Sequence, residues 1–414
     1  FYPSAGLSYV FSELIDFEPL DYGKFTVSNA TVYNDLGAYQ INETYGRQVG
    51  FPYSSTGLNG FVVPGTAVSP EVRKEKIATT EFGLNLEFFK RRVTLDAAYY
   101  MTKTTDLITT ATLAPSTGAN SLLTNIGSIK GTGLELSLGL GIIESDGFNW
   151  DLNTNFTMNN QIVEEIQPGV TELNLTTGTV ASIYAVVDED FPQVKATSYV
   201  RDPQGRVVIN PANGNPIVGG LENLGKTTPD YIVGLTNVFS YKGLKLTATL
   251  DYRTGHVFYS QLADRMEFTG RSQASVSSNR QDFIFPNSVI NTGTVENPVY
   301  VANTNIQVTG GRQNFWTNTY NDIKENYIID GTALKIRELS LSYQLADKAM
   351  DKIGVSKLSI GLVARNILTW LPEENRFSDP EFDNSIGVGN AIGIGGYTQA
   401  PPTRSFGLNL NIEF

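Results

Sequence analysis

The chain has 414 residues, of which 17% are charged, and its 42 acidic residues outnumber 30 lysines and arginines, which gives a formal net charge of −12. A chain this acidic excludes a nucleic-acid partner, because phosphates bind basic surfaces. The absence of cysteine excludes disulfides, thiolate metal sites and a cysteine nucleophile. The sequence contains no run of about 18 apolar residues, so it encodes no transmembrane helix.

The start of the chain resembles an internal segment of a longer protein. Phe1 is not preceded by an initiator methionine, a basic stretch or a signal peptide. We therefore expect a fragment.

Alternation of apolar and polar residues, which is typical of β-strands, recurs along the whole chain, whereas helical periodicity is nearly missing. Short turns at Arg91-Arg92, residues 144–147 and residues 241–243 join successive runs into hairpins of long strands. The strongest runs, in chain order, are residues 82–88, 93–101, 134–142, 148–156, 231–240, 244–252, 339–345, 358–362 and 406–414.

The connections between these runs alternate between short and long. The long polar links are residues 109–121, 166–181, 198–228 and 260–327. Short turns on one side and long loops on the other are typical of outer-membrane barrels, and runs of about ten residues suit tilted membrane strands. A soluble β-sandwich also alternates, with its polar face in water, so periodicity alone leaves that alternative open.

Six motifs in chain order carry a resemblance to a known family, the SusC-like (RagA-like) TonB-dependent transporters of Bacteroidetes outer membranes. Thr332 and Ile367-Leu368 depart from the family pattern, which leaves the substrate class open. The motifs are Phe1-Tyr2-Pro3-Ser4; Asn125-Ile126-Gly127 with residues 130–136; residues 202–205 with Leu224-Gly225 and Pro229; Asp330-Gly331 with Leu334-Lys335-Ile336-Arg337; residues 366–370 with Asp379-Pro380-Glu381; and residues 401–404 with Phe406-Gly407.

The resemblance implies an all-β fold, the later part of a transmembrane antiparallel β-barrel of about 22 strands with long extracellular loops. Residues 1–414 would form a single β-barrel domain of roughly twelve to fourteen strands, without the N-terminal plug, the TonB box and the early strands. The residues carried over from the family motifs are Asn125, Gly127, Gly133, Glu135, Asp330, Gly331, Arg337, Asn366, Trp370, Asp379, Pro380, Glu381 and Arg404. The terminal aromatic Phe414 resembles the signal that the barrel-assembly machinery reads.

A few groups of residues have the chemistry of a catalytic or metal site. His256 is the only histidine, so a Ser-His-Asp triad would need it, but its place beside Gly255 at a strand end predicts a lumen or rim position. The acidic residues Asp188, Glu189, Asp190, Glu373 and Glu374 offer calcium ligands, yet a solvated loop explains them better.

Aromatic and glycine-rich stretches have similar alternatives. Trp150, Trp370, Tyr99 and Tyr100 are able to stack on sugar rings, but an aromatic girdle at the membrane interface explains them more simply. Residues 387–396 are rich in glycine without the strand and helix of a phosphate loop, so we expect an extracellular loop. We expect no catalytic residue, no cofactor and no metal site.

Three functions follow as hypotheses. The first is TonB-dependent active import of glycan oligomers or peptides across the outer membrane, with a SusD-like surface lipoprotein and TonB as partners. The second is a passive porin-like channel or a structural barrel subunit of a larger surface complex. The third is a soluble β-sandwich enzyme or glycan-binding module, which predicts that the alternating apolar residues are buried in one core.

Overall fold

The computed structural model describes residues 1–49, 57, 59–167, 169–176, 181–308, 313–345, 355–382, 391–398 and 400–413. The chain divides into two compact units. Unit 1 comprises Phe1–Glu144, Asn149–Thr177 and Tyr184–Phe191, and unit 2 comprises Ser145–Phe148, Gly178–Ile183 and Pro192–Phe414. Within the described residues, no helix is both long and apolar enough to cross a membrane.

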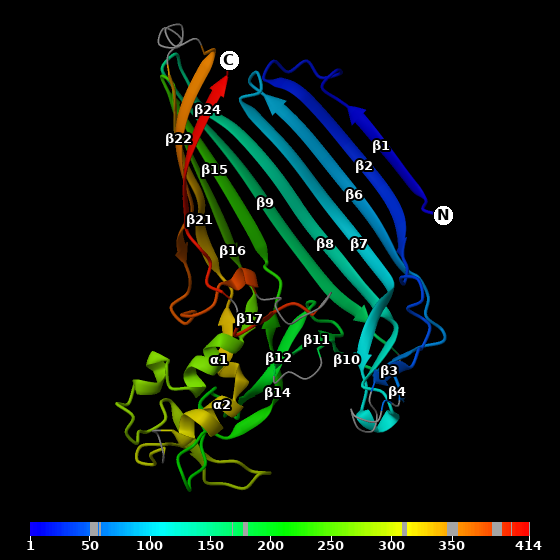
Figure 1. Ribbon diagram of the computed structural model, residues 1–414, viewed down its shortest axis with the longest axis vertical. Helices are drawn as coiled ribbons and strands as arrows, with labels where there is room; N and C mark the ends of the chain where they lie inside the picture. The colour runs from blue at the N-terminus through cyan, green and yellow to red at the C-terminus, as the bar shows by residue number, and fades with distance from the viewer. Residues whose placement is uncertain are drawn as a thin grey trace. The chain divides into compact units, whose positions relative to one another are not determined.

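Unit 1 is built on long antiparallel strands that pair with their neighbours in chain order (Figure 1). They are β1 (Ser4–Val10), β2 (Leu20–Asn34), β6 (Glu75–Phe88), β7 (Val93–Thr112), β8 (Ser121–Glu144) and β9 (Phe148–Glu165). Shorter elements lie between them: β3 (Gly46–Val49), β4 (Asn59–Val62), β5 (Thr66–Val68), η1 (Pro115–Thr117), β10 (Glu172–Asn174) and β11 (Ala181–Val186), the last of which crosses the boundary of the unit.

The predicted hairpins of unit 1 are confirmed, and their strands are longer than the alternating runs. Strands β7 and β8 have 20 and 24 residues, and they remain paired as far as Thr112 and Ser121. The long link expected at residues 109–121 is therefore mostly strand. The turn between β6 and β7 spans residues 89–92, and Phe89, Lys90 and Arg91 all have positive φ.

A small apolar core lies where β7, β8 and β9 lose their strict alternation. Val163 is 1% exposed and Ile126 is 3% exposed, in contrast to the half-exposed side chains elsewhere on these strands. Burial of these side chains holds the link after β9 against the strands. The buried members are Leu107, Ile126, Ile129, Val163, Ile166, Ala185 and Phe191.

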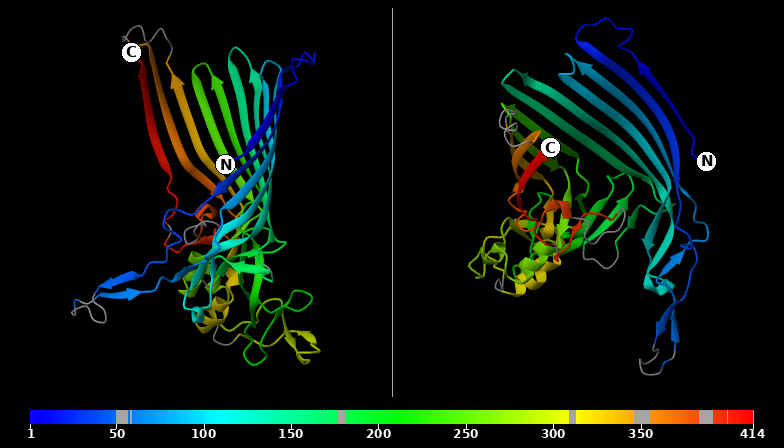
Figure 2. Two further views of the ribbon diagram at one scale, coloured as in Figure 1. Left: turned by 90° about the vertical axis from the view of Figure 1, so that its right-hand side faces the viewer. Right: turned by 45° about the horizontal axis from the view of Figure 1, so that its top comes forward.

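Unit 2 has a second series of long antiparallel strands, which lie side by side in Figure 2. The tight turn between the first two is Lys242-Gly243, both with positive φ, as two-residue hairpin turns require. The strands are β15 (Tyr231–Tyr241), β16 (Leu244–Thr254), β21 (Ala333–Gln344), β22 (Lys357–Trp370) and β24 (Ser405–Glu413). These match the predicted runs.

One face of β21, β22 and β24 is apolar and open to the surroundings. Leu341 pairs with Leu362, and Leu362 pairs with Leu408. These side chains are 40%, 58% and 71% exposed, respectively. A contiguous exposed apolar face is what a membrane strand presents to lipid. The soluble sandwich required these side chains in a core, so that alternative is wrong. The neighbouring row is Tyr343, Ile360 and Leu410.

The strands of unit 2 are irregular at Arg337. Between flanking pairs, β21 holds one residue more than β16, and that residue is Arg337. Strand β22 in turn places Asn366 and Ile367 opposite Arg337. Asn366 adopts φ 53°, a left-handed conformation that asparagine tolerates better than most residues. Such bulges redirect side chains.

The links expected as polar loops at residues 198–228 and 260–327 are instead folded and packed. Val308 and Ile323 are 0% exposed, and Phe315 is 1% exposed. The short elements in these links, and in the segments before and after them, are β12 (Gln193–Tyr199), β13 (Val207–Val208), β14 (Val218–Lys226), β17 (Val257–Ser260), α1 (Gln261–Phe268), η2 (Gln273–Val276), β18 (Ser288–Asn291), β19 (Tyr300–Ala302), η3 (Phe315–Thr319), α2 (Tyr320–Asp322), η4 (Lys324–Tyr327) and β20 (Ile328–Asp330). Two more short elements follow later in the chain, η5 (Pro380–Phe382) and β23 (Ile394–Gly395).

Helix α1 was not predicted from the sequence because its buried face is not apolar. Its buried residues are Ala263, Asp264 and Glu267, so two of its three inward positions are acidic and no apolar stripe marks it. Its N-cap, Ser260, accepts a hydrogen bond from the Ala263 amide at 3.1 Å.

Candidate functional site

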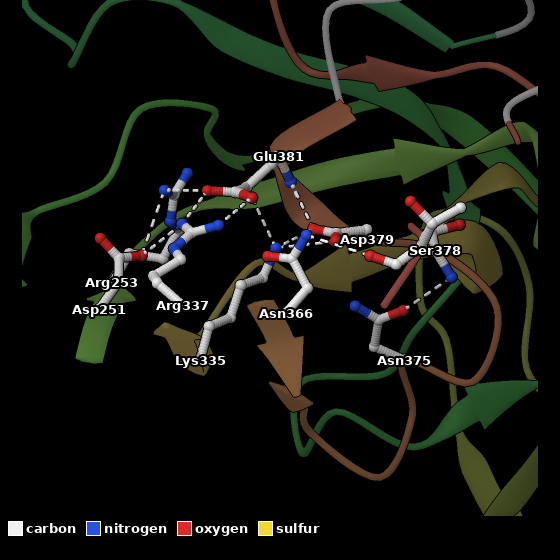
Figure 3. Close-up of polar contacts among 10 residues, drawn as sticks. Asp251, Arg253, Lys335, Arg337, Asn366, Asn375, Ser378, Asp379 and Glu381 are labelled. Atoms are coloured by element: carbon white, nitrogen blue, oxygen red, sulfur yellow. Dashed lines mark hydrogen bonds and ion pairs between the residues drawn. The ribbon is translucent and has the colours of Figure 1, made fainter. Parts of the chain in front are cut away.

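Six charged side chains of unit 2 meet where β16 and β21 approach the segment after β22 (Figure 3). Three are basic and three are acidic, so the cluster is formally neutral. We call it the charge cluster, and its members are Asp251, Arg253, Lys335, Arg337, Asp379 and Glu381.

Lys335 is the most buried member of the charge cluster. Its ammonium donates to Asp379 Oδ1 and Oδ2 at 2.6 and 2.7 Å, and to Glu381 Oε2 at 2.7 Å. Lys335 is 4% exposed and Asp379 is 8% exposed. A buried ammonium with three carboxylate contacts is fully satisfied, which offsets much of its desolvation cost.

Glu381 joins the remaining cations. Arg337 forms a two-pronged contact with its carboxylate and reaches Asp251 Oδ1 at 2.8 Å, while Arg253 donates to Glu381 Oε1 at 2.6 Å. Burial alone would raise the pKa of Glu381, but hydrogen bonds from Arg337 and Lys335 outweigh it and lower the pKa to about 2. Glu381 is therefore ionised at neutral pH.

Local structure explains why these residues meet. Asp251 and Lys335 are direct cross-strand partners on β16 and β21. The bulge at Arg337 redirects its guanidinium. Asp379 Oδ1 accepts the Glu381 amide at 3.0 Å, which fixes the turn that presents both carboxylates. The cluster consequently ties residues 379–381 to two strands, and each of its charged groups contacts a group of opposite charge.

The sequence predicted only half of the charge cluster. Arg337, Asp379 and Glu381 were among the motif residues, and the structure brings them together. Lys335 lies inside the motif Leu334-Lys335-Ile336-Arg337 but was not among the residues carried over from the family. Asp251 and Arg253 were missed, although their position on the polar face of an alternating strand is a usable signal.

The motif residues Asn125 and Gly127 of unit 1 fix the path of the backbone. The side-chain amide of Asn125 donates to the carbonyls of Arg73 and Asp106, both at 2.7 Å. A Cβ at Gly127 would lie 1.6 Å from the carbonyl oxygen of Glu165, so only glycine allows the chain after β9 to pass this closely.

Gly133 and Glu135 lie further along β8, beside the Tyr100 side chain. A Cβ at Gly133 would come within 2.2 Å of the Tyr100 ring. Tyr100 is therefore packed over a glycine on the neighbouring strand, whereas Tyr99 is 41% exposed. Trp150 is partly exposed on β9, opposite Ile143.

Gly331 and His256 form one packed unit. The Gly331 amide donates to the His256 carbonyl at 2.8 Å, and a Cβ at Gly331 would lie 2.3 Å from His256 Nε2. His256 is 3% exposed, so its ring does not line an open surface: the ring fills the space that the glycine leaves. Burial and the Arg253 cation lower the pKa of His256 to about 4. The neighbouring Asp330 accepts the Thr332 amide at 2.7 Å.

The remaining described motif residues lie in or next to β22, η5 and β24. Asn366 donates to the Thr403 carbonyl at 3.2 Å, Trp370 is 49% exposed at the end of β22, and Pro380 opens η5. Arg404 is exposed directly before β24, and Phe414 lies outside the described residues, as do residues 387–390 of the glycine-rich stretch.

The acidic residues considered for calcium do not form a metal cluster in the part of the chain that the structure describes. Asp188 has φ 64° and lies in a turn, where its amide donates to the Val163 carbonyl at 2.9 Å. Glu373 and Glu374 are exposed.

A second polar cluster in unit 2 surrounds Asp264. Its carboxylate accepts hydrogen bonds from Tyr259 at 2.5 Å, from Lys324 at 3.0 Å and from Asn321 at 2.6 Å. Burial, followed by the hydrogen bond with Asp264, raises the pKa of Tyr259. This network pins α1 to η4 inside the folded link.

A family model and similar curated proteins all point to the same family. Residues 1–251 match the family model described as TonB dependent receptor-like, beta-barrel. The chain is 26% identical to a TonB-dependent receptor of Formosa agariphila over 92% of this chain and 40% of the relative. It is 24% identical to the TonB-dependent receptor SusC of Bacteroides thetaiotaomicron over 56% of this chain and 23% of that protein.

Solved structures show the same fold. The structure of the RagAB peptide transporter aligns with a TM-score of 0.74 and 18% identity, covering 100% of this chain and 43% of that chain. The chain spans at most 40% of the length of the curated relatives it matches.

These matches agree with the exposed apolar face and the long antiparallel strands. The matched family consists of outer-membrane receptors and transporters rather than enzymes. The chain belongs to the TonB dependent receptor-like β-barrel family, and it is an outer-membrane β-barrel protein.

Proposed function

We propose that this chain is the later wall of an importer that takes up a nutrient across the outer membrane by TonB-dependent active transport. Residues 1–414 would belong to one barrel domain. The observation that carries the proposal is the combination of an apolar exposed face on β21, β22 and β24 with a family of TonB-dependent receptors. The mechanism is binding and gated passage, in which no covalent bond changes.

The polar face of unit 1 supports a role in lining a passage. A shallow trough of about 500 Å³ runs across β2, β6, β7, β8 and β9. Its lining includes Lys24, Glu81, Asp96 and Glu135, so charged and hydrogen-bonding groups face the space that a hydrophilic nutrient would cross.

The charge cluster supports a fixed wall rather than a moving gate. Six charged groups, each in contact with a group of opposite charge, hold residues 379–381 against β16 and β21. Loops that contact cargo need such rigid supports, because binding sites rest on positioned scaffolds. We assign the cluster a positioning role.

The proposed partners and cargo are taken by analogy from the similar proteins. By analogy with SusC and RagAB, a SusD-like lipoprotein would cover the extracellular side, and TonB would act through an N-terminal region. RagAB is described as a peptide importer, and glycan oligomers are the second candidate cargo.

The test is an uptake assay on the native bacterium. Cells that carry or lack the full-length gene would receive fluorescent peptides or fluorescent oligosaccharides, with and without a protonophore. Gene-dependent uptake that stops when the protonophore collapses the proton-motive force supports the importer. Uptake that persists, together with open-channel conductance of the purified protein in a planar bilayer, would establish the passive porin-like alternative instead.

A further inference from the structure

A cavity of about 590 Å³ lies within unit 2, between α1, η2, α2 and the segment after β22. This size is typical of a small-ligand pocket. Three carboxylates and one guanidinium line it, those of Glu267, Glu373, Glu374 and Arg376. With all four ionised the lining carries a formal charge of −2.

Glu267 is the unusual member. It is 9% exposed, and its Oε2 atom is enclosed without a hydrogen-bond partner among the residues that the structure describes. Its other oxygen, Oε1, has only a 3.5 Å contact from the Ser272 hydroxyl. A buried carboxylate without a partner is costly, and native proteins usually satisfy such groups.

One part of the cavity wall is apolar, and hydroxyl and amide groups such as those of Ser272 and Asn326 complete the lining. Val276, Ile328 and Phe377 contribute to the lining, and Ile328 and Phe377 are only partly exposed. An apolar wall beside carboxylates fits a ligand with a hydrocarbon stem and a cationic head, because the stem buries apolar area while the head satisfies the acid.

We propose that this cavity binds a primary alkylammonium group, with Glu267 as its principal counter-ion and Glu373 and Glu374 at its rim. A lysine side chain is the representative ligand. Arg376 lines the same cavity and is close enough to act on Glu267 electrostatically, so it competes with the ligand. The inference concerns binding alone and goes beyond the import proposal.

The test is calorimetry on the full-length protein in detergent. The probe is N-acetyl-lysine amide, and the matched control ligand is N-acetyl-norleucine amide, which keeps the stem and lacks the ammonium. Glu267→Gln should weaken binding of the lysine probe by roughly thirty-fold. Arg376→Gln should tighten it about two- to five-fold, since it removes the competing cation. Glu296→Gln, an exposed acid outside the cavity, should leave affinity unchanged.

Equal binding of the two probes would overturn the proposal, and so would a folded Glu267→Gln variant that binds the lysine probe normally. If Glu267→Gln does not fold, two measurements still test the proposal. The first compares the lysine and norleucine probes on the parent protein. The second is the affinity of Arg376→Gln for the lysine probe, and weaker binding there would contradict the assignment. Binding without transport would leave this inference intact and count against the import proposal only.

Discussion

The ammonium of Lys335 on β21 lies 2.6 and 2.7 Å from the two carboxylate oxygens of Asp379, a residue 44 positions later in the chain. Replacing Lys335 by methionine should cost about 3–5 kcal/mol, because Asp379 would remain buried without its counter-ion. Heat-induced loss of the folded band of the full-length protein, measured on unboiled gels, would report the loss as a lower transition temperature.

Two controls sharpen this prediction. Lys357→Met breaks a pair of similar length, 2.9 Å to Glu413, whose side chains are about 60% exposed, so it should cost at most about 1 kcal/mol. The double variant Lys335→Met with Asp379→Leu should recover much of the loss. Equal effects of Lys335→Met and Lys357→Met would contradict the role of burial.

Arg337 should not be replaceable by lysine. A single ammonium cannot reproduce the two-pronged contact with Glu381 while also reaching Asp251. We expect Arg337→Lys to cost about 1–3 kcal/mol and to speed proteolysis near residues 371–382. Limited proteolysis of intact outer membranes measures this, and an unchanged digestion pattern would argue against a positioning role.

Gly127 should tolerate no side chain. A Cβ there would overlap the Glu165 carbonyl at 1.6 Å, so Gly127→Ala should sharply lower the amount of folded protein in the outer membrane. Gly220→Ala is the matched control, because a Cβ at Gly220 meets nothing within 4 Å. Quantitative immunoblotting of outer-membrane fractions compares the two, and equal amounts would refute the close-approach argument.

The stability of the folded link should depend on pH through Glu267. Burial, to which Asp264 adds while Ser272 and Arg376 oppose it, raises the pKa of Glu267 to about 7 from an ordinary value of 4.5. The folded state then holds the proton more tightly than the unfolded state. The contribution is fully present below about pH 4.5 and is lost as pH rises through about 7.

The size of this effect is on the order of 3 kcal/mol. Thermal denaturation of the full-length protein between pH 5 and 8 measures it, and the Glu267→Gln variant should show a flatter profile than the parent. The other groups close enough to influence the same titration electrostatically are Tyr199, Tyr320 and Tyr327. A parallel profile in the variant would assign the pH dependence elsewhere.

The apolar face of β22 should reject charge. Leu362→Arg, in the middle of the Leu341–Leu362–Leu408 row, should cost about 2–4 kcal/mol in a bilayer. Ser340→Arg, on the opposite face of β21, should cost far less. Folding yield of the full-length protein in phospholipid vesicles tests this, and similar yields would mean that the row does not face lipid.

The long strands were predictable because alternation has a fixed period of two residues. Residues 231–240 and 244–252 emerged almost unchanged as β15 and β16. Strand β2, at Leu20–Asn34, was missed because Asn29 and Thr31 interrupt the apolar series that Phe25 and Val27 begin.

The folded links were not predictable in the same way. Phe315 and Val308 are buried together although neither belongs to a periodic run, and tertiary contacts rather than local pattern decide such segments. In the charge cluster, motif resemblance found Arg337, Asp379 and Glu381. Their partner Asp251 is visible only once strand register is known.

The irregularity at Arg337 also sets the stagger of the strands. At this level β21 has one residue more than β16, and β22 has one residue more than β21. The register of β22 is therefore shifted by two residues relative to β16, which is about 7 Å at roughly 3.3 Å per residue. Stagger, tilt and strand number are linked in any closed sheet. A single-residue deletion at this level would therefore alter the curvature of the wall itself, and its effects would reach strands that never touch the deleted residue.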